Sequence, residues 1–307
     1  MHSNIKQIKT VGDMVQYYLR TPQFLSLKPR SQKDYEYNLN KALETSVTDV
    51  KKLKDLRISN LSVSHCKIAY QEWLKKGTRT ANIISTTLSV VLRMAEELEL
   101  LVRNPMSKVK KIKEKARRVM WSQEQVKVFL DTAYSEYKWR SIGLIVHMAY
   151  EFAQRIGDMR LLKWENIDFE NSRVNLVQSK RRAEVTIPIN KSLLSMLSNQ
   201  HTDFGFQEYV APRPYPRGGS YRIYSNTEVS GVVNAIKKVA KLPPELTAMD
   251  MRRTAITEMI EAGVDITQIM AVSGHNSPNS MSPYIKHTFM SAHNALSKRE
   301  AYKDEVS

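Results

Sequence analysis

The second half of the chain contains a set of side chains that together could cleave a phosphodiester. They are Arg155, Lys180, Arg252, His275 and Tyr284. A phenol has a pKa of about 10, so at neutral pH it is a poor nucleophile unless a proton acceptor or a strong positive field assists it. Two guanidinium groups can bind the non-bridging oxygens of a phosphate, and a lysine or histidine can protonate the leaving 5′ oxygen. The set therefore predicts DNA or RNA strand cleavage by a tyrosine.

Taken one at a time, these residues have ordinary explanations. An arginine that follows an apolar helix, such as Arg155, is usually a partner of the helix dipole or of a carboxylate. A lysine in a hairpin turn, such as Lys180, usually faces solvent. Tyr284 is harder to explain, because it stands nine residues after His275 in GHNSPNSMSPY, where small polar residues leave no regular apolar face. The hypothesis therefore depends on the combination.

The elements that must position these side chains can be predicted from the spacing of apolar residues. Helical spacing occurs in residues 121–133, 140–154, 191–197, 226–240, 248–263 and 265–274. Two short β-rich runs, residues 174–177 and 185–189, flank a polar, basic turn and predict a hairpin. This part of the chain is expected to be mostly α with a small β-sheet (α+β).

The first third of the chain is expected to be helical throughout. Apolar residues recur at helical spacing in residues 11–19, 31–43, 62–76 and 80–101. Asp13, Ser31, Ser62 or Ser64, and Thr80 stand where N-cap residues would. An Asn-Pro pair at 104–105 ends the last helix, because the residue before a proline disfavours the α region. The pattern predicts a four-helix module.

Positive charge is concentrated in this first third. The chain has 47 Lys and Arg against 31 Asp and Glu, a formal net charge of +16, and residues 1–118 hold 24 of the cations and 11 of the acids. Clustered cations gain free energy by releasing counterions from phosphate backbones, so a polyanionic partner is indicated. The segment KVKKIKEKARR, residues 108–118, is expected to be a basic linker that contacts DNA, with a merely solvated linker as the alternative. Its cations are Lys108, Lys110, Lys111, Lys113, Lys115, Arg117 and Arg118.

Several other classes of protein fit the sequence poorly. Cys66 is the single cysteine, which excludes an intrachain disulfide framework and leaves no thiolate pair for a structural zinc. The longest strongly apolar stretch, residues 142–150, is far shorter than the roughly 20 residues that a membrane span needs. The N-terminus lacks the apolar core of a signal peptide. A cytoplasmic protein with no implied metal is expected.

Short motifs in the second half resemble the catalytic domain of tyrosine recombinases, the phage-integrase family. QRIGDMRLLKWENID resembles the family's first block and implies a catalytic arginine at Arg155 and a supporting acid at Asp158. QSKRRAEVTIPI resembles the family's hairpin and implies its lysine at Lys180. VSGHNSPNSMSPY resembles LGHxxxxxTxxY, which implies His275 as a catalytic residue and Tyr284 as the nucleophile.

A fourth motif contains both an ambiguity and a departure. MDMRRT resembles the family's HxLRxT, and matching Thr254 to the family threonine implies the second catalytic arginine at Arg252, with Arg253 as the fallback. Met249 stands where the family has a histidine often assigned as general base toward the tyrosine. A thioether accepts no proton at any relevant pH. Either the arginines and a neighbouring group suffice, or Met249 marks a slower enzyme.

The resemblance also implies how the chain is organised. Residues 1–107 would form a helical core-binding (SAM-like) DNA-binding domain, residues 108–118 the basic interdomain linker, and residues 119–307 the catalytic domain with a C-terminal oligomerisation segment. Residues 285–302 have the apolar spacing of a helix that could dock on a neighbouring protomer or pack on its own domain. Little chain precedes residue 10, so the arm-type domain that some integrases carry there is not expected.

The activity that the resemblance implies is site-specific recombination of double-stranded DNA at attachment sites. Tyr284 would form a 3′-phosphotyrosine and release a 5′-hydroxyl, and the covalent link conserves the energy of the phosphodiester, so no cofactor is needed. A homotetramer on two duplexes would pass through a Holliday junction, for integration or excision of a phage or mobile element in the bacterial host cytoplasm and nucleoid. A DNA-bending or directionality factor is a candidate further partner.

Two other functions remain open at this stage. A type IB topoisomerase uses similar chemistry but rotates one strand instead of exchanging it. The second alternative is a catalytically weakened DNA-binding accessory protein, of which Met249 would be the first sign. Against such decay, all five residues that could do the chemistry are chemically intact.

Overall fold

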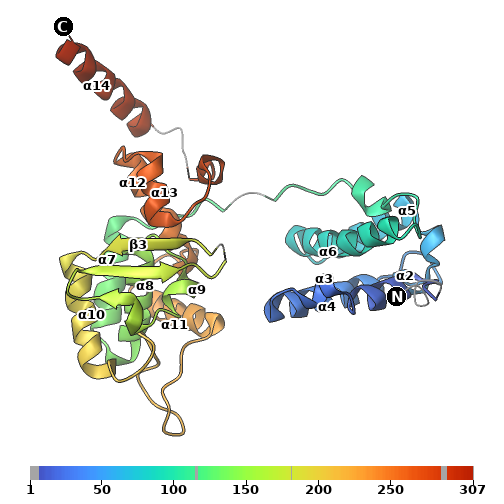
Figure 1. Cartoon of the computed structure of the whole chain (residues 1–307), viewed down its shortest axis with the longest axis horizontal. Helices are drawn as coiled ribbons and strands as arrows, with labels where there is room; N and C mark the ends of the chain where they lie inside the picture. The colour runs from blue at the N-terminus through green and yellow to red at the C-terminus, as the bar shows by residue number, and fades with distance from the viewer. Residues whose placement is uncertain (1–6, 115–116, 181, 285–288, 307) are drawn as a thin grey trace. The chain divides into compact units, whose positions relative to one another are not determined.

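The computed structural model describes residues 7–114, 117–180, 182–284 and 289–306. The chain divides into two compact units, Met1–Arg117 and Arg118–Ser307, which Figure 1 shows in blue to green and in green to red. Separate clusters of buried apolar side chains form the cores of the two units. The expectation of a mostly helical protein with a small sheet is confirmed.

The first unit is built around one long amphipathic helix. Helix α6 buries Ile84, Leu88, Val91, Leu92 and Ala95, a stripe at helical spacing that forms one wall of the core. It packs against α4 and α5. The helices are α2 (Val11–Tyr18), α3 (Pro22–Leu25), α4 (Pro29–Leu43), α5 (Val63–Leu74) and α6 (Thr78–Glu97), with 3-10 turns η1 (Leu53–Asp55), η2 (Ile58–Asn60) and η3 (Pro105–Lys108).

Three of the predicted N-caps in this unit are wrong. Helix α2 is capped by Thr10, and Asp13 instead completes the capping box three residues later. Helix α4 begins at Pro29 with Lys28 as N-cap, because proline fits the first helical position. Helix α6 begins after Gly77. The prediction of Ser62 for α5 is confirmed, since its hydroxyl accepts from the backbone of His65.

The start of the basic segment lies against the first unit. The backbone N–H of Ile112 donates to the Tyr70 hydroxyl at 2.9 Å, and the carbonyl of Ile112 accepts from Asn82 at 2.9 Å. Lys111 donates from Nζ to the Thr86 hydroxyl at 2.8 Å. Asn82 on α6 also donates to Oε1 of Glu114 at 3.4 Å, so the contacts of this segment with α5 and α6 continue to residue 114.

The second unit is arranged around helix α8 (Tyr137–Glu151), in which the nine residues from Ser141 to Ala149 are all buried. It contacts α7 (Gln123–Tyr134), α9 (Ile156–Met159), α10 (Lys191–Phe204), α11 (Asn226–Val239) and α12 (Met251–Glu261). A helix with neighbours on every side is apolar on every side. The remaining elements are α13 (Ile266–Ser273), α14 (Phe289–Val306) and the 3-10 turns η4 (Trp164–Asn166), η5 (Ala248–Asp250) and η6 (Pro278–Met281).

A three-stranded antiparallel sheet, in the order β1-β2-β3, lies in the same unit. The strands are β1 (Ile167–Asp168), β2 (Arg173–Val177) and β3 (Glu184–Pro188). Val174 pairs with Ile187 and Leu176 with Val185, and these four side chains are buried while their neighbours are exposed. The predicted hairpin is present, whereas β1 is too short to have shown a pattern.

Two side chains of helix α14 bond to backbone carbonyls at the end of α12 and just after it. Asn294 donates to the carbonyl of Glu261 at 2.8 Å, and Lys298 donates to the carbonyl of Gly263 at 2.9 Å, so both bonds reach the end of α12. Leu296 and Tyr302 are 58% and 64% exposed. Within the described parts of the chain, no helix is both long and apolar enough to cross a membrane.

Candidate active site

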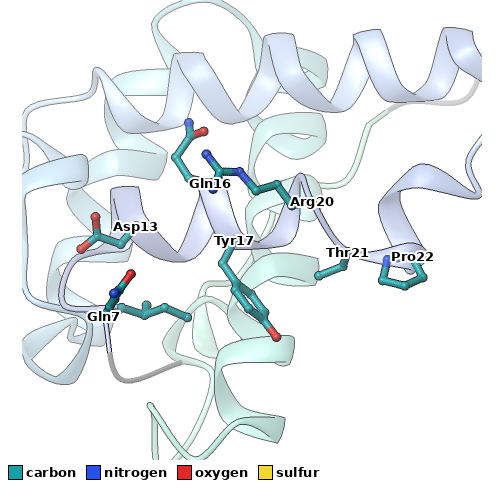
Figure 2. Close-up of a pocket in the computed structure, with 8 residues that line it drawn as sticks. Gln7, Asp13, Gln16, Tyr17, Arg20, Thr21 and Pro22 are labelled. Carbon is teal, nitrogen blue, oxygen red and sulfur yellow. The ribbon is translucent and has the colours of Figure 1, made fainter. Parts of the chain in front are cut away.

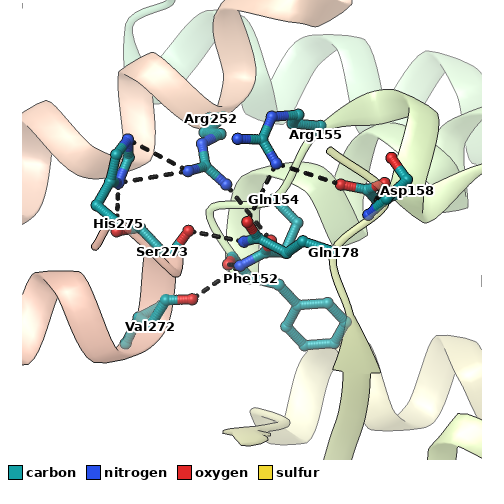
Figure 3. A network of polar contacts seen from close by, with 10 residues as sticks. Phe152, Gln154, Arg155, Asp158, Gln178, Arg252, Val272, Ser273 and His275 are labelled. Atoms are coloured by element: carbon teal, nitrogen blue, oxygen red, sulfur yellow. Dashed lines mark hydrogen bonds and ion pairs between the residues drawn. The ribbon is translucent and has the colours of Figure 1, made fainter. Parts of the chain in front are cut away.

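The structure brings four of the predicted catalytic residues, together with the predicted supporting acid Asp158, to one place in the second unit. Arg155 stands directly before α9, where the backbone turns sharply after α8 through Ala153 at a φ of 49°. Arg252 lies in the first turn of α12. His275 directly follows Gly274, the C-cap of α13, and Tyr284 lies three residues after the end of η6. Figure 3 shows that Arg155 and Arg252 point toward one another from these separate elements.

Arg252 and His275 form the buried part of the site, each only 7% exposed. The Nη2 atom of Arg252 lies 3.3 Å from Nδ1 and 3.4 Å from Nε2 of the His275 ring. The ring of Tyr284 meets that of His275 edge to face, with centroids 5.5 Å apart. The guanidinium of Arg253 lies 5.8 Å from the Tyr284 ring centre. The phenol is therefore surrounded by cationic or polarisable groups.

The electrostatics of Arg252 show how much positive charge is gathered here. Burial lowers the pKa of its guanidinium, and repulsion from Arg155 lowers it further. The nearby Tyr284 hydroxyl opposes these effects through attraction and a hydrogen bond. An arginine stays charged even so. Two guanidinium groups that repel one another at close range form a site that an anion would stabilise.

Arg155 is held beside a buried carboxylate. Its Nη1 atom lies 3.6 Å from Oδ2 of Asp158, whose side chain is 6% exposed against 27% for Arg155. The other carboxylate oxygen of Asp158 accepts from the backbone N–H of Ser179 at 3.2 Å. Asp158 thus links the arginine to the first residues of the β2–β3 turn.

Two glutamines that the sequence analysis did not single out complete the network (Figure 3). Gln154 and Gln178 are fully buried. Gln178 accepts from Nη1 of Arg155 at 3.1 Å, and Gln154 accepts from Nη1 of Arg252 at 3.4 Å. Gln178 also donates to the side-chain oxygen of Gln154 at 2.6 Å. The signal that could have revealed them is an amide at the end of an apolar run, directly before Arg155, and another two residues before Lys180.

The segment before His275 is held by the same network. Ser273 is fully buried, and its hydroxyl lies 2.8 Å from Nδ1 of His275. Gln178 donates to the carbonyl of Ser273 at 2.8 Å. Gly274 ends α13 in the left-handed conformation, with a φ of 66°, and a Cβ there would lie 2.5 Å from Nε2 of Gln178. Glycine is required on both counts.

Lys180 and Met249 are not part of this network. Lys180 is exposed in the turn after β2, although the start of that turn is fixed through Ser179. Met249 lies in η5 with its side chain 79% exposed.

Of the predicted DNA-contacting cations, Lys115 lies outside the described residues. The other six, Lys108, Lys110, Lys111, Lys113, Arg117 and Arg118, are exposed.

The site does not coincide with the hollow that Figure 2 shows. That hollow, about 430 Å³, lies beside α2 in the first unit and is lined by Gln7, Ile8, Asp13, Gln16, Tyr17, Arg20, Thr21 and Pro22, none of them a predicted catalytic residue. No group of three or more His, Cys, Asp or Glu that could hold a metal ion gathers within the residues that the structure describes.

Comparisons with known proteins point to the same part of the chain. The model of the phage integrase family matches residues 119–290. A shufflon-specific DNA recombinase of Escherichia coli is 25% identical over 176 residues, which cover 56% of this chain and 41% of that protein. Tyrosine recombinase XerA of Pyrococcus furiosus is 28% identical over 217 residues, 68% of this chain and 70% of its own. The chain thus covers less than half of the E. coli recombinase.

Solved structures show a similar fold over nearly the whole chain. The Tn1549 transposon integrase in complex with circular intermediate DNA has a TM-score of 0.75 at 18% identity, covering 94% of this chain and 99% of that one. A lambda integrase tetramer bound to a Holliday junction has a TM-score of 0.67 at 17% identity, covering 90% of this chain and 77% of that one. At this level of identity the likeness is one of fold.

Proposed function

The chain belongs to the phage integrase family, and from that membership and the geometry of the site we propose that it is a site-specific tyrosine recombinase. It would cleave and rejoin double-stranded DNA at attachment sites to integrate or excise a phage or mobile element, in the bacterial cytoplasm. The observation that carries the proposal is that four separate segments bring Arg155, Arg252, His275 and Tyr284 to one place: Arg252 lies near each of the other three, and His275 meets the Tyr284 ring.

Each residue has a role that follows from its position. Arg155 and Arg252 would bind the non-bridging oxygens of the scissile phosphate and stabilise the charge that develops there. The phenolic oxygen of Tyr284 would attack phosphorus as the bond to the 5′ oxygen breaks. Lys180, in the turn whose start is fixed beside Asp158, would give its proton to that oxygen. His275 would hold Arg252 and stabilise the same phosphate.

The positive field around Tyr284 supports catalysis without the family histidine. Arg252 lies within hydrogen-bonding reach of the phenol, and Arg253 and His275 lie against its ring. Cations at these positions can stabilise the negative charge that develops on a phosphate attacked by Tyr284. Met249 is largely exposed and is not a member of this group. We therefore favour the first of the two readings of Met249, in which the arginines and a neighbouring group suffice.

DNA binding outside the site would use the first unit and the basic segment. We propose that residues 1–107 are the core-binding domain, a four-helix SAM-like module, and that residues 108–118 contact phosphates. Five helices are described there, of which α3 is a single turn. The exposure of six of the seven predicted cations supports this assignment.

A second cluster of cations lies on the loop between α10 and α11. We call residues 213–222 the basic finger: its two sides pair through Arg213 N–H to Arg222 carbonyl at 2.8 Å and Arg217 N–H to Ser220 carbonyl at 2.9 Å. Gly218 and Gly219 form its tip with φ of 61° and 75°. A cavity of about 350 Å³ beside it is lined by four cations and no acid: Lys138, Arg213, Arg217 and Arg222, with Pro214, Tyr215, Pro216 and Tyr224. The finger would add phosphate contacts.

The solved lambda integrase is a tetramer on a Holliday junction. We propose that this chain also acts as a homotetramer on two duplexes. The exposure of Leu296 and Tyr302 on α14, and the two polar bonds that tie this helix to α12, support a C-terminal segment that can dock on a neighbouring protomer.

The rival activities predict different products from the same site. A type IB topoisomerase would relax supercoils as a monomer and would never join two duplexes. A decayed accessory protein would bind attachment-site DNA without cleaving it. The test is to incubate the protein with two differently labelled duplexes from the element's attachment region, without metal, and to look for joined strands and four-way junctions. In parallel, the protein is incubated with a supercoiled plasmid that carries the same region, and relaxation of the plasmid without joint molecules from the duplexes would favour the topoisomerase.

A further inference from the structure

The two arginines of the site are held by neutral amides as well as by a carboxylate. Gln178 accepts from Arg155 at 3.1 Å and Gln154 accepts from Arg252 at 3.4 Å, and the two glutamines bond to one another at 2.6 Å. Both are fully buried. Burying an amide without hydrogen bonds would cost free energy of folding. The two glutamines are therefore held by specific hydrogen bonds and do more than fill space in the core.

The contacts leave only one orientation for each amide. Nε2 of Gln178 faces two acceptors, the carbonyl of Ser273 and Oε1 of Gln154, so its own oxygen must face Arg155. Nε2 of Gln154 likewise faces the carbonyls of Phe152 and Val272, at 3.0 and 2.8 Å. A carboxylate could not replace either amide, because it has no N–H to donate to these carbonyls.

Because the amides of Gln154 and Gln178 are neutral, they affect the electrostatic potential of the site differently from carboxylates. An amide oxygen fixes the direction of a guanidinium without cancelling its charge, whereas a carboxylate at the same place would form an ion pair. Asp158 already faces Arg155 at 3.6 Å, a distance longer than that of a strong charged hydrogen bond. The site therefore keeps most of its positive potential for the phosphate.

The same glutamine connects three segments of the site. Gln178 directly follows Val177, the last residue of β2, and begins the turn that carries Lys180; its backbone N–H donates to the carbonyl of Ala183 at 2.9 Å and closes that turn. Its side chain bonds to the segment before His275 through the Ser273 carbonyl. Gly274 leaves the space for it, since a Cβ there would lie 2.5 Å from Nε2.

We propose that Gln178, supported by Gln154, is a positioning residue that aligns Arg155, the Lys180 turn and the His275 segment for one phosphate. The proposal rests on the proposed function. Gln178 touches no substrate itself and acts through the arginine and the turn. Misplacing a catalytic group by about 1 Å costs on the order of 10²-fold in rate, and a loss of that size is expected when the amide is removed.

The test uses the full chain and a nicked attachment-site duplex that traps the covalent adduct. Gln178→Met keeps the length of the side chain and removes its hydrogen bonds. Gln178→Glu keeps the shape but places a carboxylate against two carbonyl oxygens and pairs it with Arg155. Both variants are expected to form the adduct on the order of 10²-fold more slowly at saturating protein, with little change in affinity for an uncut duplex.

The chain offers a matched control in Gln200. It is also buried, accepts from an arginine, Arg140, at 3.0 Å, and donates to a carbonyl, that of Val210, at 3.1 Å. Gln200→Met should lower the melting temperature as Gln178→Met does and leave the cleavage rate of folded protein unchanged. This comparison separates lost stability from lost positioning.

A double-mutant cycle with Arg155→Lys identifies the route of the effect. If Gln178 acts through Arg155, its substitution adds little to the loss that Arg155→Lys causes alone. Provided that wild type forms the adduct, any of three results would overturn the positioning role. They are a cleavage rate for Gln178→Met equal to that of wild type, an equal loss of rate in Gln200→Met, and full additivity of the losses from Gln178→Met and Arg155→Lys. Absence of any adduct with wild type would instead overturn the proposed function, and the positioning role with it.

Discussion

Nη2 of Arg252 lies 3.3 and 3.4 Å from the two ring nitrogens of His275, and both side chains are 7% exposed. The guanidinium therefore lies against the imidazole while Nη1 reaches back to Gln154. Only a planar, forked cation can make these contacts and still face a phosphate. Arg252 and His275 therefore form the buried side of the site, next to Tyr284.

Replacing Arg252 by lysine tests whether its guanidinium binds the scissile phosphate. Lysine keeps the charge but lacks the fork, so Arg252→Lys should lower the rate of adduct formation by about 10² to 10³-fold, as when one donor to a developing anion is lost. Single-turnover cleavage of a nicked duplex measures the rate. Arg173→Lys, at an exposed arginine paired with Asp168, is the control and should behave as wild type. Comparable rates for Arg252→Lys and wild type would contradict the assignment and shift attention to Arg253.

Met249→His restores the family's side chain at a position that is 79% exposed. Because the site already surrounds Tyr284 with Arg252, Arg253 and His275, we expect a gain well below the roughly 10²-fold that an essential general base supplies. We also expect stability within about 0.5 kcal/mol of wild type. The measurement is the pH–rate profile of cleavage between pH 5.5 and 8. A large gain with a new inflection near the histidine pKa would show that the missing base limits this enzyme.

The buried His147 side chain should make the free energy of unfolding depend on pH. Burial lowers its pKa from 6.5 to about 4, so the unfolded chain takes up the proton first as the pH falls. The stability that depends on neutral His147 is complete above about pH 6.5 and is lost progressively toward pH 4, by roughly 3 kcal/mol in all. Its neighbours are the Tyr134 hydroxyl at 2.9 Å and the Glu151 carboxylate at 3.7 Å.

Glu151 acts in the opposite direction. Burial, with repulsion from Glu258, raises its pKa, so its protonation on acidification favours the folded state and offsets part of the loss. His147→Gln should therefore flatten the fall in melting temperature between pH 6.5 and 4.5. Thermal melts at several pH values measure this. An equally steep fall in the variant would mean that His147 is not the group responsible.

The basic finger predicts a salt effect. No acidic side chain in the described parts of the chain pairs with Arg217 or Arg222. Each phosphate contact contributes about 0.9 to the slope of log affinity against log salt on duplex DNA, so Arg217→Gln with Arg222→Gln should reduce that slope by roughly two. Binding titrations at several salt concentrations measure it. Lys127→Gln, at a cation already paired with Asp131, is the control. An unchanged slope would mean that the basic finger does not contact phosphates of the DNA.

The helices and the hairpin could be predicted because their apolar residues follow regular spacing. Helix α8 and the β2–β3 pair are examples, since each buries the residues that the pattern marked. N-caps were less predictable: Thr10 and Asp13 can both cap a helix, and only the fold decides which of them stands first. The two-residue strand β1 exists only because β2 is beside it.

The buried polar side chains that support the catalytic residues could not be predicted. Arg155, Arg252, His275 and Tyr284 could be named from motif spacing, and the structure places them together. Gln154, Gln178 and Ser273 acquire their partners through contacts between segments as many as 118 residues apart. No local pattern encodes such pairing. Lys180 and Met249 are both exposed, so packing inside the unit does not fix their orientation.

The central claim is that Tyr284 is the nucleophile. Wild-type protein and Tyr284→Phe are incubated with nicked attachment-site DNA without metal, and the products are separated on a denaturing gel. The account predicts a covalent protein–DNA adduct with wild type, linked through a 3′-phosphotyrosine at Tyr284, and none with Tyr284→Phe, which should bind the same DNA. An adduct that persists in Tyr284→Phe, or cognate complexes of wild type that are never covalent, would contradict it.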